Sequence, residues 1–182
     1  MIPFRTRSTS QLVLLTLLAL GAPGMSFSES SPPDSSLDAA GTADSPLAPF
    51  ELLVGGEWQI SILRHRFEWG IGRHTVLARS YDGDGKLAAE ARWFWHPGEK
   101  VIKGYSIDAT GNSFAEMTTR FEEGVMINVL QTIDPEGTTA TYTGRWLFTD
   151  RDHYDWTLFS HGANGEKTQV MQATASREAQ SE

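Results

Sequence analysis

The feature that most constrains the fold is a series of turn clusters that recur at nearly even spacing from Asp82 to Gly165. Each cluster supplies Gly, Asn, Asp or Pro, the residues that accept or fix turn dihedral angles. The segments between them are rich in Val, Ile, Thr, Trp, Tyr and Phe, and this spacing and content are typical of an all-β sandwich or barrel. The clusters are Asp82–Gly85, His96–Glu99, Asp108–Asn112, Glu122–Gly124, Asp134–Gly137, Thr149–Asp152 and His161–Gly165.

Alternation of apolar and polar residues within these segments indicates a sheet with one buried face. In 88–95 we place Ala89, Ala91, Trp93 and Trp95 inward, and in 138–148 the face that carries Tyr142 and Trp146. In 125–133 we place the Val and Ile residues inward together with Gln131. We predict eight to ten strands, near 57–63, 66–70, 74–81, 87–95, 100–107, 113–121, 125–133, 138–149, 153–160 and 168–175.

Short links between successive antiparallel strands leave two exposed edges unless the sheet closes. We therefore predict an all-β fold, an antiparallel up-and-down barrel with a short N-terminal helix over one mouth. The helix is expected between Leu47 and Val54, where Gly55-Gly56 ends it. A β-sandwich is the alternative.

The amino end has the order of a secretory signal peptide, with basic residues, a short apolar run and small residues in 1–28. The apolar run is shorter than a membrane span, so no span is expected after cleavage. Residues 29–46 are rich in Ser, Pro and Asp and are predicted to be a disordered tether. The barrel domain is expected over 47–177 and a tail over 178–182. These features predict a periplasmic or secreted protein; an uncleaved N-terminal anchor is the alternative.

Composition excludes several classes of function. The chain of 182 residues has no Cys, so it has no disulfide, thiolate nucleophile or iron–sulfur cluster. Its formal charge of −8 argues against nucleic acid as a partner. We predict no cofactor, no metal site and no catalytic residues, because no nucleophile, phosphate or calcium motif is complete. His65, between two arginines, is a poor position for a cation, and Glu90 and Glu116 are expected on the outer face.

The run Phe50 to Trp58 resembles the opening of calycin barrels, in which a short helical turn leads into Gly-x-Trp and the first strand. Gly56-Glu57-Trp58 fills that triplet, and over 47–177 the pattern resembles bacterial lipocalin-like domains of unknown function. The resemblance implies that Trp58 is structural and that Arg177, near the end of the last strand, packs over its indole. It transfers no catalytic residue.

The remaining candidates for function are side chains that we expect to face the interior. They are the predicted ligand-binding residues Trp93, Trp95, Tyr105, Met117, Gln131, Tyr142, Trp146 and Trp156. Small barrels either fill their interior with side chains or hold one small ligand, and the sequence leaves both open. The leading hypothesis is binding of a small apolar or amphipathic molecule. The alternatives are an enzyme on the same scaffold (an isomerase, cyclase or hydrolase) and a protein-interaction barrel without a small ligand.

Overall fold

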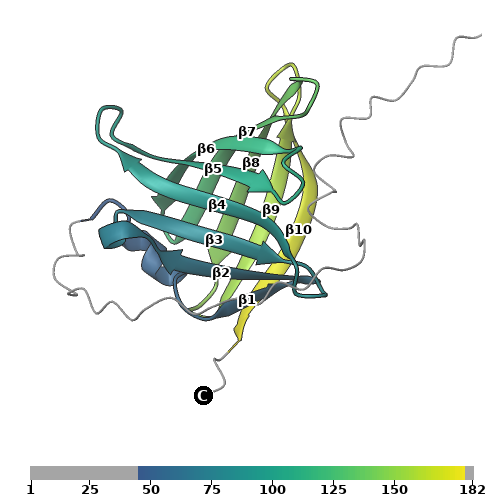
Figure 1. The fold of residues 1–182 in the computed structure, drawn as a ribbon. Coiled ribbons are helices and arrows are strands. Elements are labelled where there is room, and N and C mark those ends of the chain that lie inside the picture. Colours follow the sequence, from purple (N-terminus) through teal and green to yellow (C-terminus); the bar gives the residue numbers. More distant parts are fainter. Residues whose placement is uncertain (1–44, 179–182) are drawn as a thin grey trace, which may run out of the picture.

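The protein forms a closed barrel of ten antiparallel strands in a computed structural model that describes residues 45–178 (Figure 1). Each strand pairs with the next along the chain, and the last pairs with the first. The all-β class and the closed up-and-down barrel are therefore confirmed. The strands are β1 (Glu57–Ile60), β2 (Leu63–Trp69), β3 (Thr75–Tyr81), β4 (Leu87–His96), β5 (Val101–Asp108), β6 (Phe114–Glu122), β7 (Val125–Ile133), β8 (Thr139–Phe148), β9 (His153–His161) and β10 (Lys167–Glu178).

The short N-terminal helix expected between Leu47 and Val54 is not found as such, because the segment before β1 forms only a 3-10 turn, η2 (Ala48–Leu52). Pro49 occupies its first turn, and two glycines with positive φ, Gly55 and Gly56, turn the chain into β1. A second 3-10 turn, η3 (Ile71–Arg73), links β2 to β3. The predicted signal peptide and nearly all of the predicted tether lie outside the described residues.

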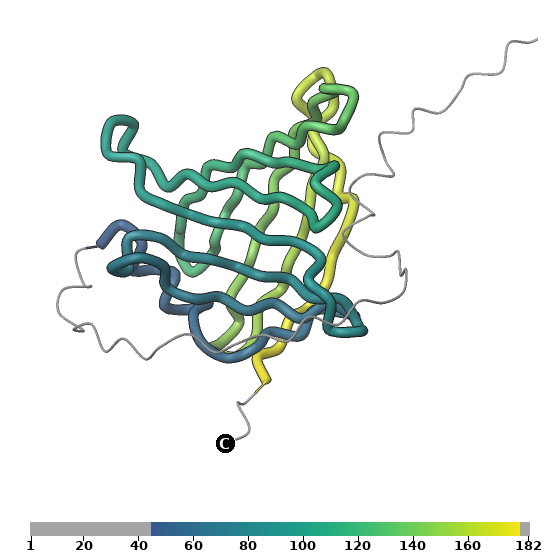
Figure 2. Tube along the Cα trace, in the orientation of Figure 1, coloured from purple at the N-terminus to yellow at the C-terminus, as the bar shows by residue number. Residues whose placement is uncertain are grey.

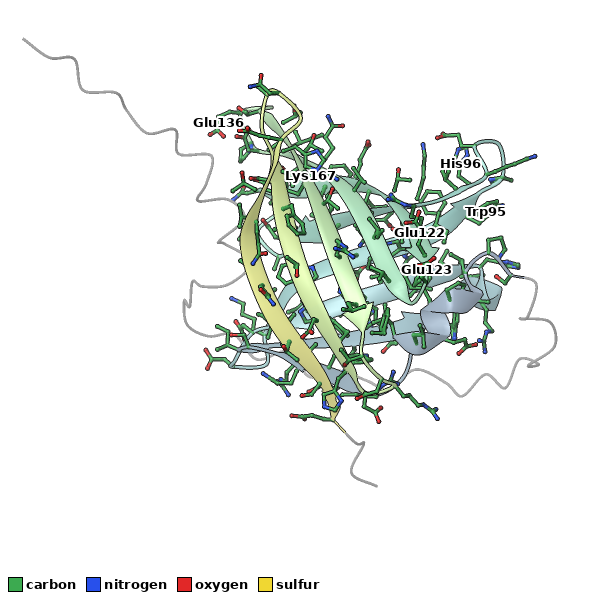
Figure 3. The ribbon with its side chains drawn as sticks, turned by 180° about the vertical axis from the view of Figure 1, so that it is seen from behind. Trp95, His96, Glu122, Glu123, Glu136 and Lys167 are labelled. Atoms are coloured by element: carbon green, nitrogen blue, oxygen red, sulfur yellow. The ribbon has the colours of Figure 1, made fainter. Side chains whose placement is uncertain are left out.

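The two ends of the barrel differ. The β2–β3, β4–β5, β6–β7 and β8–β9 links lie at the end that η2 covers, here called the η2 mouth; the other five links surround the far mouth. Figure 3 shows both: Trp95 and His96 lie near Glu122 and Glu123 at the η2 mouth, whereas Lys167 lies toward the far mouth.

The barrel closes at a short seam in which β1 pairs with β10 over only four residue pairs (Figure 2). Trp58 and Arg177 face each other in that register, and the Arg177 guanidinium carbon lies 4.5 Å from the Trp58 ring centroid. The Trp58 indole N–H donates to the Leu53 carbonyl oxygen at 2.9 Å. Arg177 donates to the carbonyl oxygens of Leu52, Val54 and Gly55. The side chains of Trp58 and Arg177 thus hold η2 and the glycine turn after it against the seam.

The large side chains of the core gather at the η2 mouth. Phe50 and Leu53, from η2 and the residue after it, are fully buried. The Phe50 ring lies 5.5 Å from that of Trp93 and 5.1 Å from that of Phe121. The fully buried Tyr154 packs on Trp58, with 4.9 Å between ring centroids. Burial of each large apolar side chain contributes about 1.5–3 kcal/mol, so this aromatic floor is a main source of stability in a barrel without disulfides.

The structure corrects two predicted strand faces. In β7 the buried residues are Met126 and Asn128, so the Val and Ile residues and Gln131 lie on the outer face. In β5 the buried residues are Ile102 and Gly104, so Tyr105 lies outside and stacks on Phe114 of β6. Both faces of β7 are largely apolar, and alternation therefore gave no signal of which one is inside.

Replacement of Arg177 by Ala should lower the free energy of unfolding by about 2–3 kcal/mol, because carbonyl oxygens at the seam lose their charged donor. The measurement is urea denaturation followed by Trp fluorescence. Arg145→Ala, on the exposed outer face of β8, is the control and should change stability by less than about 0.5 kcal/mol. Equal effects of the two substitutions would contradict the role assigned to Arg177.

Candidate functional site

Small side chains surround the far mouth on the inside of the barrel. From β3 to β10 most inward residues near this end are Ser, Ala or Thr, in contrast to the aromatic floor; Asp108 of β5 also lies there, and β1 and β2 contribute the buried Ile60 and Leu63. Because short side chains reach little of the way across a barrel, this ring leaves the far mouth less filled than the η2 mouth. The small-residue ring consists of Ser80, Ala89, Ser106, Ala115, Thr132, Ala140, Ser160 and Thr168.

Below part of this ring, inward side chains of β7–β10 remain partly exposed. On the other side of the barrel, Phe67, Trp93, Ile102 and Met117 are buried. Partly exposed inward residues also occur on β2–β5, at His65, Ser80, Ala91 and Ser106, but the large aromatic ones gather on β7–β10. We call this surface the β7–β10 inner wall; it consists of Leu130, Thr132, Ala140, Tyr142, Trp146, Trp156, Ser160, Met171 and Ala173.

Two mid-strand glycines make room for the indoles of the interior. A Cβ atom at Gly144 of β8 would lie 2.9 Å from Trp146 Cζ3 and 3.4 Å from Trp156 Nε1. A Cβ atom at Gly104 of β5 would lie 2.6 Å from the Arg92 carbonyl oxygen and 3.0 Å from Trp93 Cδ1. The Trp146 and Trp156 rings consequently stand side by side on the inner wall, with centroids 6.1 Å apart. An apolar wall with a few polar atoms is the usual chemistry of a small-molecule site.

Besides Arg177 Nε and the Tyr154 hydroxyl, three interior atoms have no hydrogen-bond partner among residues 45–178. They are the indole nitrogens of Trp93 and Trp156 and Nε2 of His65. A buried polar atom without a partner costs about 1–3 kcal/mol, so most such atoms in native proteins are paired. All three atoms are buried from solvent, so a bound molecule could supply the missing partner only if neighbouring side chains moved.

His65 is the interior group that the sequence interpretation missed. It pairs in register with Trp58 and Ser80, which are both inward, so its ring is inside and its two Arg neighbours are outside. Burial of the ring lowers the pKa of His65 to about 4. The imidazole is therefore neutral at physiological pH. His65 lies between Arg64 and Arg66, two charged residues that face outward. This alternation was the signal that could have predicted an inward His65.

A buried polar pair connects β6 and β7 within the barrel. The Thr119 hydroxyl donates to the Asn128 Oδ1 atom at 2.8 Å, and the two residues are 3% and 1% exposed. Burial without pairing would be costly for both side chains, and the hydrogen bond offsets that cost. The pair fixes the register between these strands and places polarity next to the aromatic floor. Neither residue was among the predicted site residues.

The structure brings together only part of the predicted ligand-binding set. Tyr142, Trp146 and Trp156 lie on the β7–β10 inner wall. Trp93 and Met117 are buried in the packed core on the other side, and Trp95 packs against that core at the η2 mouth. The inward placement of Tyr105 and Gln131 is wrong. A ligand-binding role for the inward residues stays a prediction.

The mid-strand carboxylates face outward, as the sequence predicts. Glu90 forms an ion pair with Arg79 at 3.4 Å, and Glu116 is exposed opposite Tyr105 and Gln131. Neither Glu90 nor Glu116 can therefore be the interior carboxylate that the alternative enzyme hypothesis requires. In residues 45–178 no three His, Cys, Asp or Glu side chains gather as a metal site would require. Within the same residues, no helix has the length and apolar character needed to cross a membrane.

Comparison of the chain with the models of known protein families finds no match, and a search of curated proteins finds no similar sequence. What the described part of the chain defines is a closed ten-stranded antiparallel barrel. It has an aromatic floor, a small-residue ring and one partly exposed inner wall.

The depressed pKa of His65 predicts a loss of stability in mild acid. The unfolded chain takes up a proton near pH 6.5, whereas the folded protein does so only near pH 4. Stability from this group is therefore fully present above about pH 6.5 and is lost as the pH falls toward 4, by up to about 3 kcal/mol. Urea denaturation at pH 7 and pH 4.5 measures it.

His65→Gln is the matched variant, because it removes the titrating group and leaves the carboxylates that also titrate in acid. Its free energy of unfolding should fall less than that of the wild type between the two pH values. A wild-type pH dependence that the variant reproduces in full would show that His65 is not buried in its neutral form.

Proposed function

We propose that the protein binds a small apolar or amphipathic molecule inside the barrel and that this molecule enters by the far mouth. The observation that carries this proposal is the contrast between the small-residue ring and the aromatic floor. One end is filled by η2 and by rings such as Phe50 and Trp93, whereas at the other end β3–β10 carry Ser, Ala and Thr, and large buried side chains come only from β1 and β2. A barrel whose only task was stability would gain from large apolar side chains at both ends.

The β7–β10 inner wall is the proposed contact surface. Trp146, Trp156 and Tyr142 supply aromatic area, and Leu130 and Met171 supply flexible aliphatic contacts. The Tyr142 hydroxyl adds a polar group within that apolar surface. Aromatic rings with one polar edge suit molecules that are mostly apolar and carry a few oxygen atoms.

A lipocalin-like role in the periplasm or outside the cell is part of the same proposal. It depends on the resemblance of 47–177 to lipocalin-like domains and on the signal-like residues 1–28. An apolar molecule that must cross water benefits from a carrier that buries it. A protein purified from its own host should therefore retain an organic mass in native mass spectrometry.

The test of the site uses N-phenyl-1-naphthylamine, an uncharged dye that fluoresces in apolar surroundings. Ala173 lies on the inner wall opposite Trp156, and Gln172 is its exposed outward neighbour. Ala173→Trp fills the interior and should weaken dye binding at least tenfold, whereas Gln172→Trp should change it less than twofold. Far-UV circular dichroism and the urea midpoint establish that each variant is folded.

Because a large side chain at position 173 can itself disturb packing, Ala140→Phe near the far mouth is a second obstructing variant. Its control is Thr141→Phe on the outer face. Saturable binding that inward substitutions weaken and outward ones leave intact supports the proposal. Equal affinity in all folded variants, or no saturable binding by the wild type, overturns it.

A further inference from the structure

The inner wall of the barrel is almost free of ionised side chains. In the strands between Glu57 and Glu178, the register places every Lys and Glu on the outer face, and every Arg except Arg177. The outer face shows the opposite: ion pairs such as Arg79 with Glu90 and Arg66 with Glu57 cross neighbouring strands. Charge is thus sorted by face along the described barrel.

The few interior groups that could carry charge are occupied or neutral. Arg177 at the η2 mouth is bound to backbone carbonyl oxygens and lies 3.4 Å from Asp152. Asp108 at the far mouth accepts hydrogen bonds from the backbone N–H groups of Thr110 and Asn112 in its own turn. His65 is neutral because burial lowers its pKa, and burial raises the pKa of the Tyr154 hydroxyl.

An ionised ligand would therefore enter an apolar interior without a free counter-ion. Removal of a carboxylate or sulfonate from water carries a large desolvation cost, which proteins offset with an opposite charge or several hydrogen bonds. The inner wall offers neither. What it offers is apolar and aromatic area with the uncharged hydroxyl group of Tyr142, which suits a neutral oxygen or nitrogen atom.

We infer that the barrel selects uncharged ligands: apolar molecules whose polar atoms are carbonyl, ether or hydroxyl groups, with carboxylates and other anions excluded. This inference rests on the proposed function and specifies the class of ligand for that site. The sorting of charge by face is its basis.

Two dyes of nearly the same shape test the inference. The compound 8-anilinonaphthalene-1-sulfonate is N-phenyl-1-naphthylamine with one added sulfonate. At pH 7.5 the wild type should bind the uncharged dye at least tenfold more tightly than the sulfonate. Displacement of the uncharged dye by 2-dodecanone, but not by dodecanoate at equal concentration, is the expected result with unrelated ligands.

The second part of the test adds a positive charge inside the barrel and measures whether anion binding increases. Thr132 belongs to the small-residue ring and points inward, and Gln131 beside it is exposed on the outer face. Thr132→Lys supplies the missing counter-ion and should strengthen sulfonate binding at least fivefold, whereas Gln131→Lys, with the same change in net charge, should alter it less than twofold.

The outcomes separate the two claims. Equal affinity for both dyes, with both weakened by Ala173→Trp, would leave interior binding in place and overturn the selection of uncharged ligands. Equal effects of the two lysine variants would also overturn it, because the sulfonate would then be bound outside. Absence of saturable binding of either dye and of 2-dodecanone would overturn the proposed function, and the inference with it.

Discussion

Closure of the sheet between β1 and β10 is the constraint on which the rest of the structure depends. Without it, two strands would expose their unpaired backbone groups, and the aromatic floor would be open to water. The seam has only four residue pairs, and the Arg177 side chain adds hydrogen bonds across it. Its guanidinium covers Trp58 and binds the carbonyl oxygens of the turn after η2. The same contacts therefore close the sheet and fill one mouth.

Closure also gives every strand an inside and an outside, and this division carries the functional argument. Because η2 covers one mouth, the large buried aromatic side chains that contribute most to stability lie at that mouth. At the far mouth, β3–β10 carry mostly small inward residues, and the β7–β10 inner wall is partly exposed. Charge follows the same division: ion pairs lie on the outer face, and the inner face carries only Arg177 and Asp108, one at each mouth. A neutral interior with one less filled mouth is the physical basis for the proposed ligand class.

Much of the fold could be predicted because turn chemistry is local. Clusters such as Asp134–Gly137 mark hairpins without reference to any other part of the chain, and most predicted strand limits lie within two residues of those observed. The faces of β5 and β7 could not be predicted. In β7 apolar residues occupy both faces, and in β5 the interior is lined by Gly104, which a search for large side chains overlooks. Similarly, the expected helix is only the short 3-10 turn η2, which Gly55 and Gly56 follow with positive φ and which Arg177 contacts across the seam.

The candidate site was harder to predict, because partial exposure inside a barrel depends on distant packing. Tyr142, Trp146 and Trp156 were chosen with Trp93 and Met117 as equivalent interior residues. The structure divides them into an accessible wall and a buried core, according to where η2 packs. No alternation pattern encodes that division. His65, by contrast, could have been found, since it alternates with two arginines.

The central claim is that a ligand sits on the inner wall of β7–β10, and methyl NMR tests it most directly. Leu130 and Met171 carry methyl groups on that wall, whereas Val129 and Leu147 carry them on the outer face of the same region. Titration with N-phenyl-1-naphthylamine should shift the Leu130 and Met171 methyl signals and give contacts to the dye protons. Contacts to Val129 and Leu147, with Leu130 and Met171 unchanged, would place the ligand outside the barrel and contradict the account.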